Sequence, residues 1–351
     1  MSATSSAGTG PKPSPIKGFV VGAAATCSAV TFTNVFEVAK VRMQLQGELN
    51  ARSAAGTGPP LRVYTSAPQA LVSIARGEGI RGLQRGLVSA YIYQTVMNGI
   101  RLGFYDPLKH LLSATAHGVA GVPVDAAGNA LTDRSVPTWL VRFDTTAVPL
   151  AAGFMTGAMG ALASSPLFLV KTRMQSYSSD PRLAGVGTQH KYRSVFHALT
   201  VVTQEGGIKG LWRGASISML RTGCGSSTQL FLYDRIKRSL LAPAGPGQAP
   251  RFTDGIPLHA TASMMTGLLV ASVMNPFDVV MTRNYNQPVR ADGSGVLYKG
   301  PLDCAIKTWR GEGVRAFGKG WLAHYLRAGP HTILTFVFLE QYRKLQGTYW
   351  P

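Results

Sequence analysis

A pattern that occurs three times along the chain limits the possible folds more than any other feature of the sequence. Three blocks align without a gap, starting at Tyr64, Tyr192 and Tyr298. Each block later contains a base followed by glycine, and then an acid with a base three residues further along. The base–glycine steps are Arg85–Gly86, Arg213–Gly214 and Lys319–Gly320, and the acid–base pairs are Asp106 and Lys109, Asp234 and Lys237, and Glu340 and Arg343. Chance would not keep these features in register three times, so the sequence predicts three copies of one structural unit.

Apolar segments separate these blocks. Three segments carry no charge, apart from the neutral His259 in the third, and are long enough to cross a hydrocarbon core of about 30 Å: residues 18–36, 145–170 and 256–277. Three others are apolar except for one arginine each: residues 87–105 with Arg101, 215–233 with Arg221 and 321–339 with Arg327. The sequence therefore predicts an all-α membrane protein with six transmembrane helices.

The formal charge of +19 is compatible with a nucleic-acid binder, but the distribution of the bases argues against one. The lysines and arginines form no continuous stripe and instead alternate with the apolar segments, as expected for loops beside anionic lipid. We therefore expect no nucleic-acid partner. The sequence also shows no nucleophile–base set, no cluster of metal ligands and no phosphate-binding loop, so we expect no catalytic residues, no metal site and no enzyme activity.

A second shared element ends each of the three uncharged segments. It reads "VFEVAKVRMQ" at residues 35–44, "PLFLVKTRMQ" at 166–175 and "PFDVVMTRNY" at 276–285. Each repeat thus contains a span, a charged motif, a loop with a short amphipathic helix, and a second span. The expected organisation is a disordered tail at 1–15, repeats at 16–114, 145–242 and 256–346, an exposed loop at 115–144 and a linker at 243–255.

Together, these motifs resemble the mitochondrial carrier family over residues 16–346. The resemblance implies six transmembrane helices in three pseudo-threefold repeats around a central cavity, with short helices on the matrix side. It also implies a multi-pass protein of the mitochondrial inner membrane that functions as a monomer by alternating access. The expected substrates are small divalent anions: oxaloacetate first, with sulfate, thiosulfate, malonate and isopropylmalate.

The charged motifs permit two interpretations. Glu37 and Lys40 are three residues apart on one helix face, so they could form a local surface pair worth a few tenths of a kcal/mol. The family instead implies a matrix gate, a ring in which Glu37 pairs with Lys171 and Asp278 with Lys40. In that ring the third acid position is Phe168 and the third base position is Met281. Because both members of this third pair are apolar, neither leaves a lone buried charge. The local interpretation gives no reason for this joint loss, so the ring is favoured.

The acid–base pairs at the ends of the blocks imply a second ring on the cytosolic side. By the family pattern Asp106 pairs with Lys237, Asp234 with Arg343, and Glu340 with Lys109. All three pairs are complete here, so we expect the cytosolic gate to be the more ionic of the two. The two rings should not form at the same time.

Arg221 and Arg327 each lie seven residues past the glycine of the base–glycine step, about 10 Å along a helix. Each could extend to the membrane surface, but two arginines at one depth indicate a wet cavity that attracts a dianion. The family's substrate contact points are Tyr93 with Gln94, Arg221 with Thr222, and Arg327. Arg101 is expected to steer the anion into the cavity.

Several helix starts predict lipid contacts, because their backbone N–H groups can hold a phosphate. The family binds cardiolipin in this way, and the corresponding glycines are Gly86, Gly214, Gly300 and Gly320. No other cofactor is expected. Alternatives that remain open are a dicarboxylate/phosphate exchanger, a proton-leak carrier, and proton coupling through His259, His324 or His331.

Overall fold

The structure is a computed structural model that describes residues 15–46, 63–119, 147–179, 188–242, 252, 255–290 and 293–349. The predicted tail, most of the 115–144 loop and most of the 243–255 linker lie outside these residues. Within the described ranges the chain is helical, and the only β-type pairing is an isolated bridge between Val289 and Gly295. The predicted all-α fold class is confirmed.

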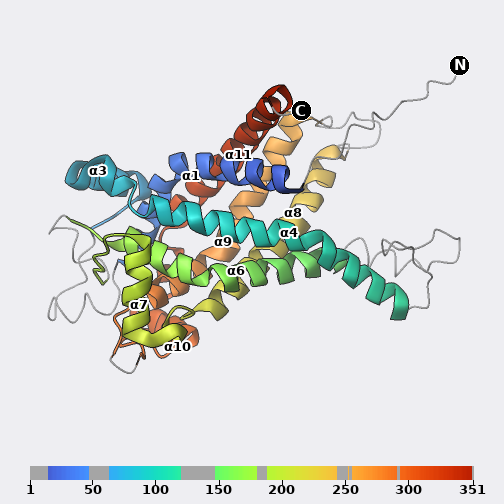
Figure 1. Cartoon of the computed structure of the whole chain (residues 1–351). Helices are drawn as coiled ribbons and strands as arrows, with labels where there is room; N and C mark the ends of the chain where they lie inside the picture. The colour runs from blue at the N-terminus through green and yellow to red at the C-terminus, as the bar shows by residue number, and fades with distance from the viewer. Residues whose placement is uncertain are drawn as a thin grey trace, which may run out of the picture.

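Six long helices form the body of the molecule (Figure 1). They are α1 (Pro15–Leu45), α4 (Leu87–Val119), α6 (Val148–Ser176), α8 (Ala215–Leu241), α9 (Ile256–Asn286) and α11 (Trp321–Tyr349). Each helix contacts the next, and α11 returns to α1, so the six close into a ring. The first helices of the three repeats, α1, α6 and α9, also contact one another. This is the predicted pseudo-threefold arrangement.

Among the described residues, the first long helix of each repeat is long and apolar enough to cross a membrane: Val20–Leu45, Val148–Ser176 and Thr261–Asn286. Helices α4, α8 and α11 are as long but carry the arginines. Their polar side chains turn inward, since Arg221 and Thr222 on α8 and His324 on α11 are all buried. These polar side chains in the middle of α8 and α11 therefore belong to the interior of the bundle rather than to its lipid-facing surface.

Short helices lie between the paired long ones, at the predicted matrix end. They are α3 (Ala67–Leu83), α7 (Val195–Gly210) and α10 (Pro301–Glu312), the last followed by a 3-10 helix, η2 (Val314–Gly318). Serine side chains cap two of them, because Ser66 accepts from the Gln69 amide and Ser194 from the His197 amide. Figure 1 shows these helices at the end of the molecule opposite the start of α1 and the end of α11.

The glycines of the three base–glycine steps allow the second helix of one repeat to approach the first helix of the next. Gly86, Gly214 and Gly320 all have φ between 69° and 75°, where other residues are strained. A Cβ would lie 3.0 Å from Gln175 Cγ at Gly86 and 3.1 Å from Gln44 Cγ at Gly320. Close helix packing therefore accounts for these glycines. Gly300 differs, because its backbone is extended and its surroundings are open.

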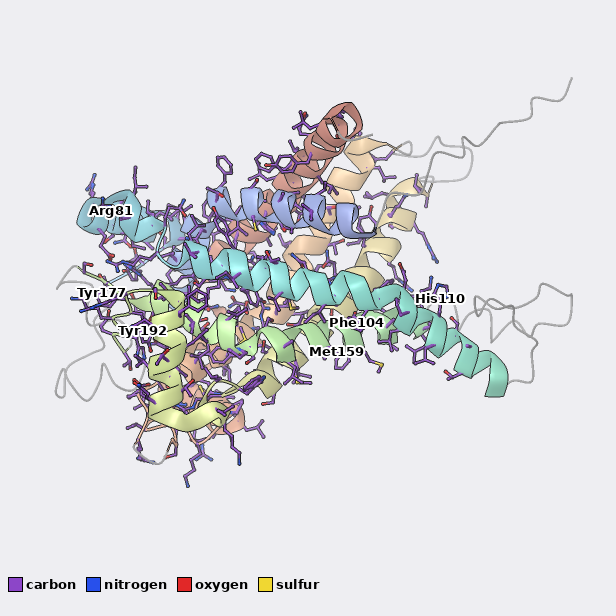
Figure 2. The ribbon with its side chains drawn as sticks, viewed as in Figure 1. Arg81, Phe104, His110, Met159, Tyr177 and Tyr192 are labelled. Atoms are coloured by element: carbon purple, nitrogen blue, oxygen red, sulfur yellow. The ribbon has the colours of Figure 1, made fainter. Side chains whose placement is uncertain are left out.

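Helix α4 is longer than the sequence predicted. It continues to Val119, past the expected end of the first repeat at residue 114. Figure 2 shows Phe104 and His110 along the part of α4 that leads to this extension, whereas Arg81, Tyr177 and Tyr192 lie at the end formed by the short helices.

Candidate functional site

Two buried ion pairs join different repeats where α1, α6 and α9 meet. Lys171 Nζ lies 2.8 Å from Glu37 Oε2, and Lys40 Nζ lies 2.8 Å from Asp278 Oδ2. Lys40 thus pairs with a carboxylate of the third repeat rather than with Glu37 on its own helix. The ring interpretation of the charged motifs is correct for these two pairs, and the local interpretation is wrong.

Apolar side chains occupy the third position of this ring. Met281 is buried in the cluster against which Phe168 packs. The Phe168 ring lies edge-on to Tyr93, with centroids 5.0 Å apart, and 5.6 Å from the ring of Tyr285. Neither position therefore leaves a charge without a partner in the bundle interior.

A second set of arginines, which the sequence interpretation did not assign, connects the repeats below the gate. Each belongs to the charged motif, two residues after the gate position, and donates through Nε to a backbone carbonyl of the following repeat. The pairs are Arg42 with Gln175, Arg173 with Tyr285, and Arg283 with Gln44. The sequence signal for this role was an arginine at the same place in all three motifs, two residues after the gate position. A residue type that recurs at one place in every repeat indicates an equivalent partner in every repeat.

The same arginines also bind the acids of the short helices. Arg42 Nη1 lies 2.5 Å from Glu78 Oε1, and Arg283 Nη1 lies 2.5 Å from Glu312 Oε1, both with buried carboxylates. Arg173 is 3.2 Å from Glu205, whose side chain is 40% exposed. Glu205 stands one position earlier than the other two acids, which explains the looser contact. The second repeat is therefore the least firmly braced at the matrix end.

Burial and hydrogen bonding act in opposite directions on these carboxylates. Burial would raise the pKa of Glu78, but hydrogen bonds from Arg42 and Ser178 hold that pKa below its usual value. Burial likewise opposes ionisation of Glu312, while hydrogen bonds from Arg283 and Lys319 keep its pKa lowered. Both carboxylates remain ionised at neutral pH and can brace the arginines.

Arg221 reaches the gate directly. Its Nε donates to Asp278 Oδ1, and both side chains are buried. The other oxygen of Asp278 faces Lys40, and His324 Nδ1 lies 2.9 Å from it. A predicted substrate-binding arginine and a predicted gate carboxylate are therefore partners in one cluster, which their positions in the sequence did not indicate.

Arg327 lies one helical turn beyond His324 on α11. Its Nε is buried and has no hydrogen-bond partner among the described residues. The charge of Arg327 acts on Glu37 and on Lys40, so it stands within electrostatic reach of both gate pairs. The structure thus brings Arg221 and Arg327 to the same charged region between the helices.

The two predicted substrate contacts on α4, Tyr93 and Gln94, have different neighbours. The ring of Tyr93 lies over the gate, with Lys171 Nζ 5.0 Å from its centroid. Gln94 Nε2 is 3.4 Å from His331 Nε2, and the other ring nitrogen of His331 is 3.3 Å from Thr33 Oγ1. His331 therefore joins the polar set beside Arg327, a neighbour of Gln94 that the contact-point pattern did not include.

Two other predicted site residues stand apart from this cluster. Thr222 is buried against Gly157 of α6, where a Cβ on the glycine would lie 3.4 Å from Thr222 Cγ2. Arg101 is partly buried further along α4, and its electrostatic partners are Tyr93 and Tyr105. Thr222 thus packs between helices, and Arg101 lies about two turns beyond Tyr93 along α4.

The predicted cytosolic pairs are not formed where the side chains are described. Glu340 is exposed and pairs with Lys344 on its own helix, at 2.9 Å, rather than with Lys109. Asp106 is exposed and makes no ion pair with a described side chain. Lys237 is partly buried, and the side chains of Asp234 and Arg343 lie outside the described part. Among the described side chains, the matrix ring is therefore formed, whereas Asp106 and Glu340 are not paired with the bases that the family pattern assigns to them.

Comparison with known proteins agrees with this architecture. The family model described as "Mitochondrial carrier protein" matches residues 11–116, 143–243 and 253–349. The mitochondrial oxaloacetate transport protein of Schizosaccharomyces pombe is 44% identical, over 94% of this chain and 91% of that protein. The protein of the same name in Saccharomyces cerevisiae is 42% identical, over 93% of this chain and 89% of its own length.

A third relative carries a different substrate in its name. The mitochondrial citrate transporter E of Aspergillus niger is 42% identical, over 93% of this chain and 92% of that protein. Three repeats, six long helices around a charged centre and a ring of ion pairs between repeats accompany these matches. The chain belongs to the mitochondrial carrier family, whose members transport solutes across the mitochondrial inner membrane.

Proposed function

We propose that the protein transports oxaloacetate and related small dianions across the inner membrane by alternating access and catalyses no chemical reaction. Sulfate, thiosulfate, malonate and isopropylmalate are the other proposed substrates. The names of the two yeast relatives support oxaloacetate. The observation that carries the proposal is the balance of charge at the centre of the bundle.

Four bases and two carboxylates meet there. The carboxylates of Glu37 and Asp278 face the bases Lys40, Lys171, Arg221 and Arg327. The bases therefore exceed the carboxylates by two positive charges. A doubly negative solute would balance this excess.

The types of side chain also suit a dicarboxylate or sulfate. Arg221 and Arg327 can each form two parallel hydrogen bonds with a carboxylate or a sulfate. Tyr93, Gln94 and His331 offer neutral hydrogen-bonding groups beside them, suited to a keto or hydroxyl oxygen. Citrate, the substrate in the name of the A. niger relative, is the second candidate, but its third negative charge would exceed the balance described above.

The arrangement of the two gates supports a cytosol-open state that receives the anion. The matrix ring is formed, while Glu340 pairs within its own helix. On binding, the anion would favour the state in which the matrix ring opens and the cytosolic pairs assemble. Because the six helices of one chain enclose the site, a monomer suffices for this cycle.

Uptake into proteoliposomes tests the substrate class. The panel contains labelled oxaloacetate, sulfate, malate, citrate and phosphate, each measured with and without an imposed pH gradient. We expect saturable oxaloacetate and sulfate uptake, and the gradient decides between exchange and proton symport. Preferred malate–phosphate exchange would instead support the exchanger, and proton conductance inhibited by purine nucleotides would support the leak carrier.

Replacing the central arginines tests the site itself. We expect Arg221→Ala and Arg327→Ala each to reduce oxaloacetate uptake at least 100-fold, since a lost charge-assisted fork removes about 3 kcal/mol of binding. Arg221→Lys should recover only part of the loss, because lysine keeps the charge but not the fork. Arg81→Ala, on exposed α3, is the control. Uptake at the wild-type rate in either alanine variant would remove that arginine from the site.

We also propose that cardiolipin binds at the helix starts marked by Gly86, Gly214, Gly300 and Gly320. Support comes from exposed apolar side chains on the short helices, such as Phe196, Ile208 and Leu302, which suit contact with lipid at the membrane surface. Basic residues such as Lys209 and Lys299 lie close to these glycines in the sequence. Lipid phosphate would then brace the matrix end between repeats.

A further inference from the structure

Asp278 has more charged neighbours than its counterpart in the gate. Glu37 pairs with Lys171, whereas Asp278 bonds to Lys40 through one oxygen and to Arg221 through the other. The Asp278 side chain is fully buried, and His324 lies beside the oxygen that faces Lys40. One gate carboxylate therefore occupies the guanidinium that the proposed function assigns to the substrate.

This contact also has a particular place in the ring of repeats. We call the boundary between two repeats a seam. At the depth of the gate, Glu37–Lys171 joins repeats one and two, and Asp278–Lys40 joins repeats three and one. The seam between repeats two and three has Phe168 and Met281 at its gate position. Among the described side chains at this depth, Arg221–Asp278 is the ion pair across that seam.

We propose that Asp278 competes with the substrate for Arg221, and that the bound dianion opens the matrix gate by taking its place. A substrate carboxylate on Arg221 would release Asp278 from this partner and so break the ionic connection between repeats two and three. The matrix gate would then open first along this seam. This inference rests on the proposed function, because it requires a dianion at Arg221.

The exchange is physically favourable for two reasons. Replacing one carboxylate by another at Arg221 conserves a charge-assisted hydrogen bond, so the guanidinium is never left buried without a partner. Asp278 also keeps a partner, because Lys40 and His324 remain beside its second oxygen. Only the position of the negative charge changes: it passes from a residue anchored in α9 to a solute that can leave.

Neutralising Asp278 tests the competition. In proteoliposomes we expect Asp278→Asn to lower the KM for oxaloacetate about tenfold, equivalent to about 1.4 kcal/mol, because Arg221 no longer has an internal partner. The matched control is Glu37→Gln, which removes the same charge from the same ring but does not contact Arg221. A merely structural role in the gate predicts equal KM changes for the two variants.

The basic partners provide a second comparison if Asp278→Asn does not fold. Lys40→Gln leaves Asp278 free to hold Arg221 more tightly, so the KM should rise several-fold more than in Lys171→Gln, which removes an equal charge. Equal KM values for Asp278→Asn and Glu37→Gln would overturn the proposed competition between Asp278 and the substrate. If Asp278→Asn does not fold, equal KM values for Lys40→Gln and Lys171→Gln would do the same. If the wild-type protein takes up no dianion at all, the proposed function fails instead, so the two failures are distinguishable.

Discussion

At the scale of single residues, the absence of a charge at one position explains the absence of the opposite charge at another. Phe168 and Met281 belong to different repeats and are far apart in sequence, yet they occupy the third position of one ring. A lysine at position 281 alone would lie in the buried apolar cluster without a new acidic partner from the second repeat. The two apolar residues are thus a matched substitution for an ion pair.

A double-mutant cycle at this position tests the ring. We expect Met281→Lys to lower the free energy of unfolding by about 3 kcal/mol, because it buries an unpaired ammonium group. Adding Phe168→Asp should restore part of this loss by forming an inter-repeat pair, and the melting temperature in detergent measures both effects. Additive losses in the double variant would show that the two positions do not face each other.

At the scale of elements, arginines of the long helices hold the short helices through ion pairs. These ion pairs are not equally buried in the three repeats. The buried carboxylate of Glu78 on α3 pairs with Arg42 and Arg85. The buried carboxylate of Glu312 on α10 pairs with Arg283 and Lys319. Glu205 on α7 is exposed and binds a single arginine. Helix α7 is therefore expected to be the most easily detached of the three.

Three equivalent substitutions measure this inequality. Glu78→Gln and Glu312→Gln should each lower the free energy of unfolding by about 1–3 kcal/mol, because a buried arginine loses its ionised partner. Glu205→Gln should cost less than about 1 kcal/mol, as is typical of an exposed ion pair. The measurement is the melting temperature in detergent, and three equal shifts would contradict the asymmetry.

At the scale of the whole molecule, stability depends on how the repeats are joined. His190, in the second repeat before α7, donates through Nε2 to the Asn286 carbonyl at the end of α9, a contact of 2.9 Å across the seam between repeats two and three. Burial, and then the charge of Arg173, lower the pKa of His190 to about 4. The folded protein therefore holds this histidine in its neutral form.

The melting temperature should consequently fall as the pH decreases from about 6.5, the pKa of an unfolded histidine, to about 4. The unfolded chain takes up a proton in this range while the folded chain does not, so protonation favours unfolding. His190→Gln should reduce the slope of melting temperature against pH over this window. An unchanged slope would show that His190 does not contribute, and the lowered pKa values of Glu78 and Glu312 place their own effect at more acidic pH.

The sequence by itself determined the three repeats and the six spans, because both depend on spacing and apolar length along the chain. The partners within the matrix ring were implied by the resemblance to the carrier family. The joint loss of charge at Phe168 and Met281 favoured that ring over a local pairing of Glu37 with Lys40. The fold class needed no further information.

Only the tertiary structure decided which side chains meet across the seams. The contact between Arg221 and Asp278, the arginines that cross to the next repeat, and the packing of Thr222 against Gly157 all depend on the rotation and offset of neighbouring helices. Whether the acids and bases at the other end of the bundle meet depends on the angles between the long helices. Residue spacing within one helix fixes neither quantity, because both arise from packing between helices.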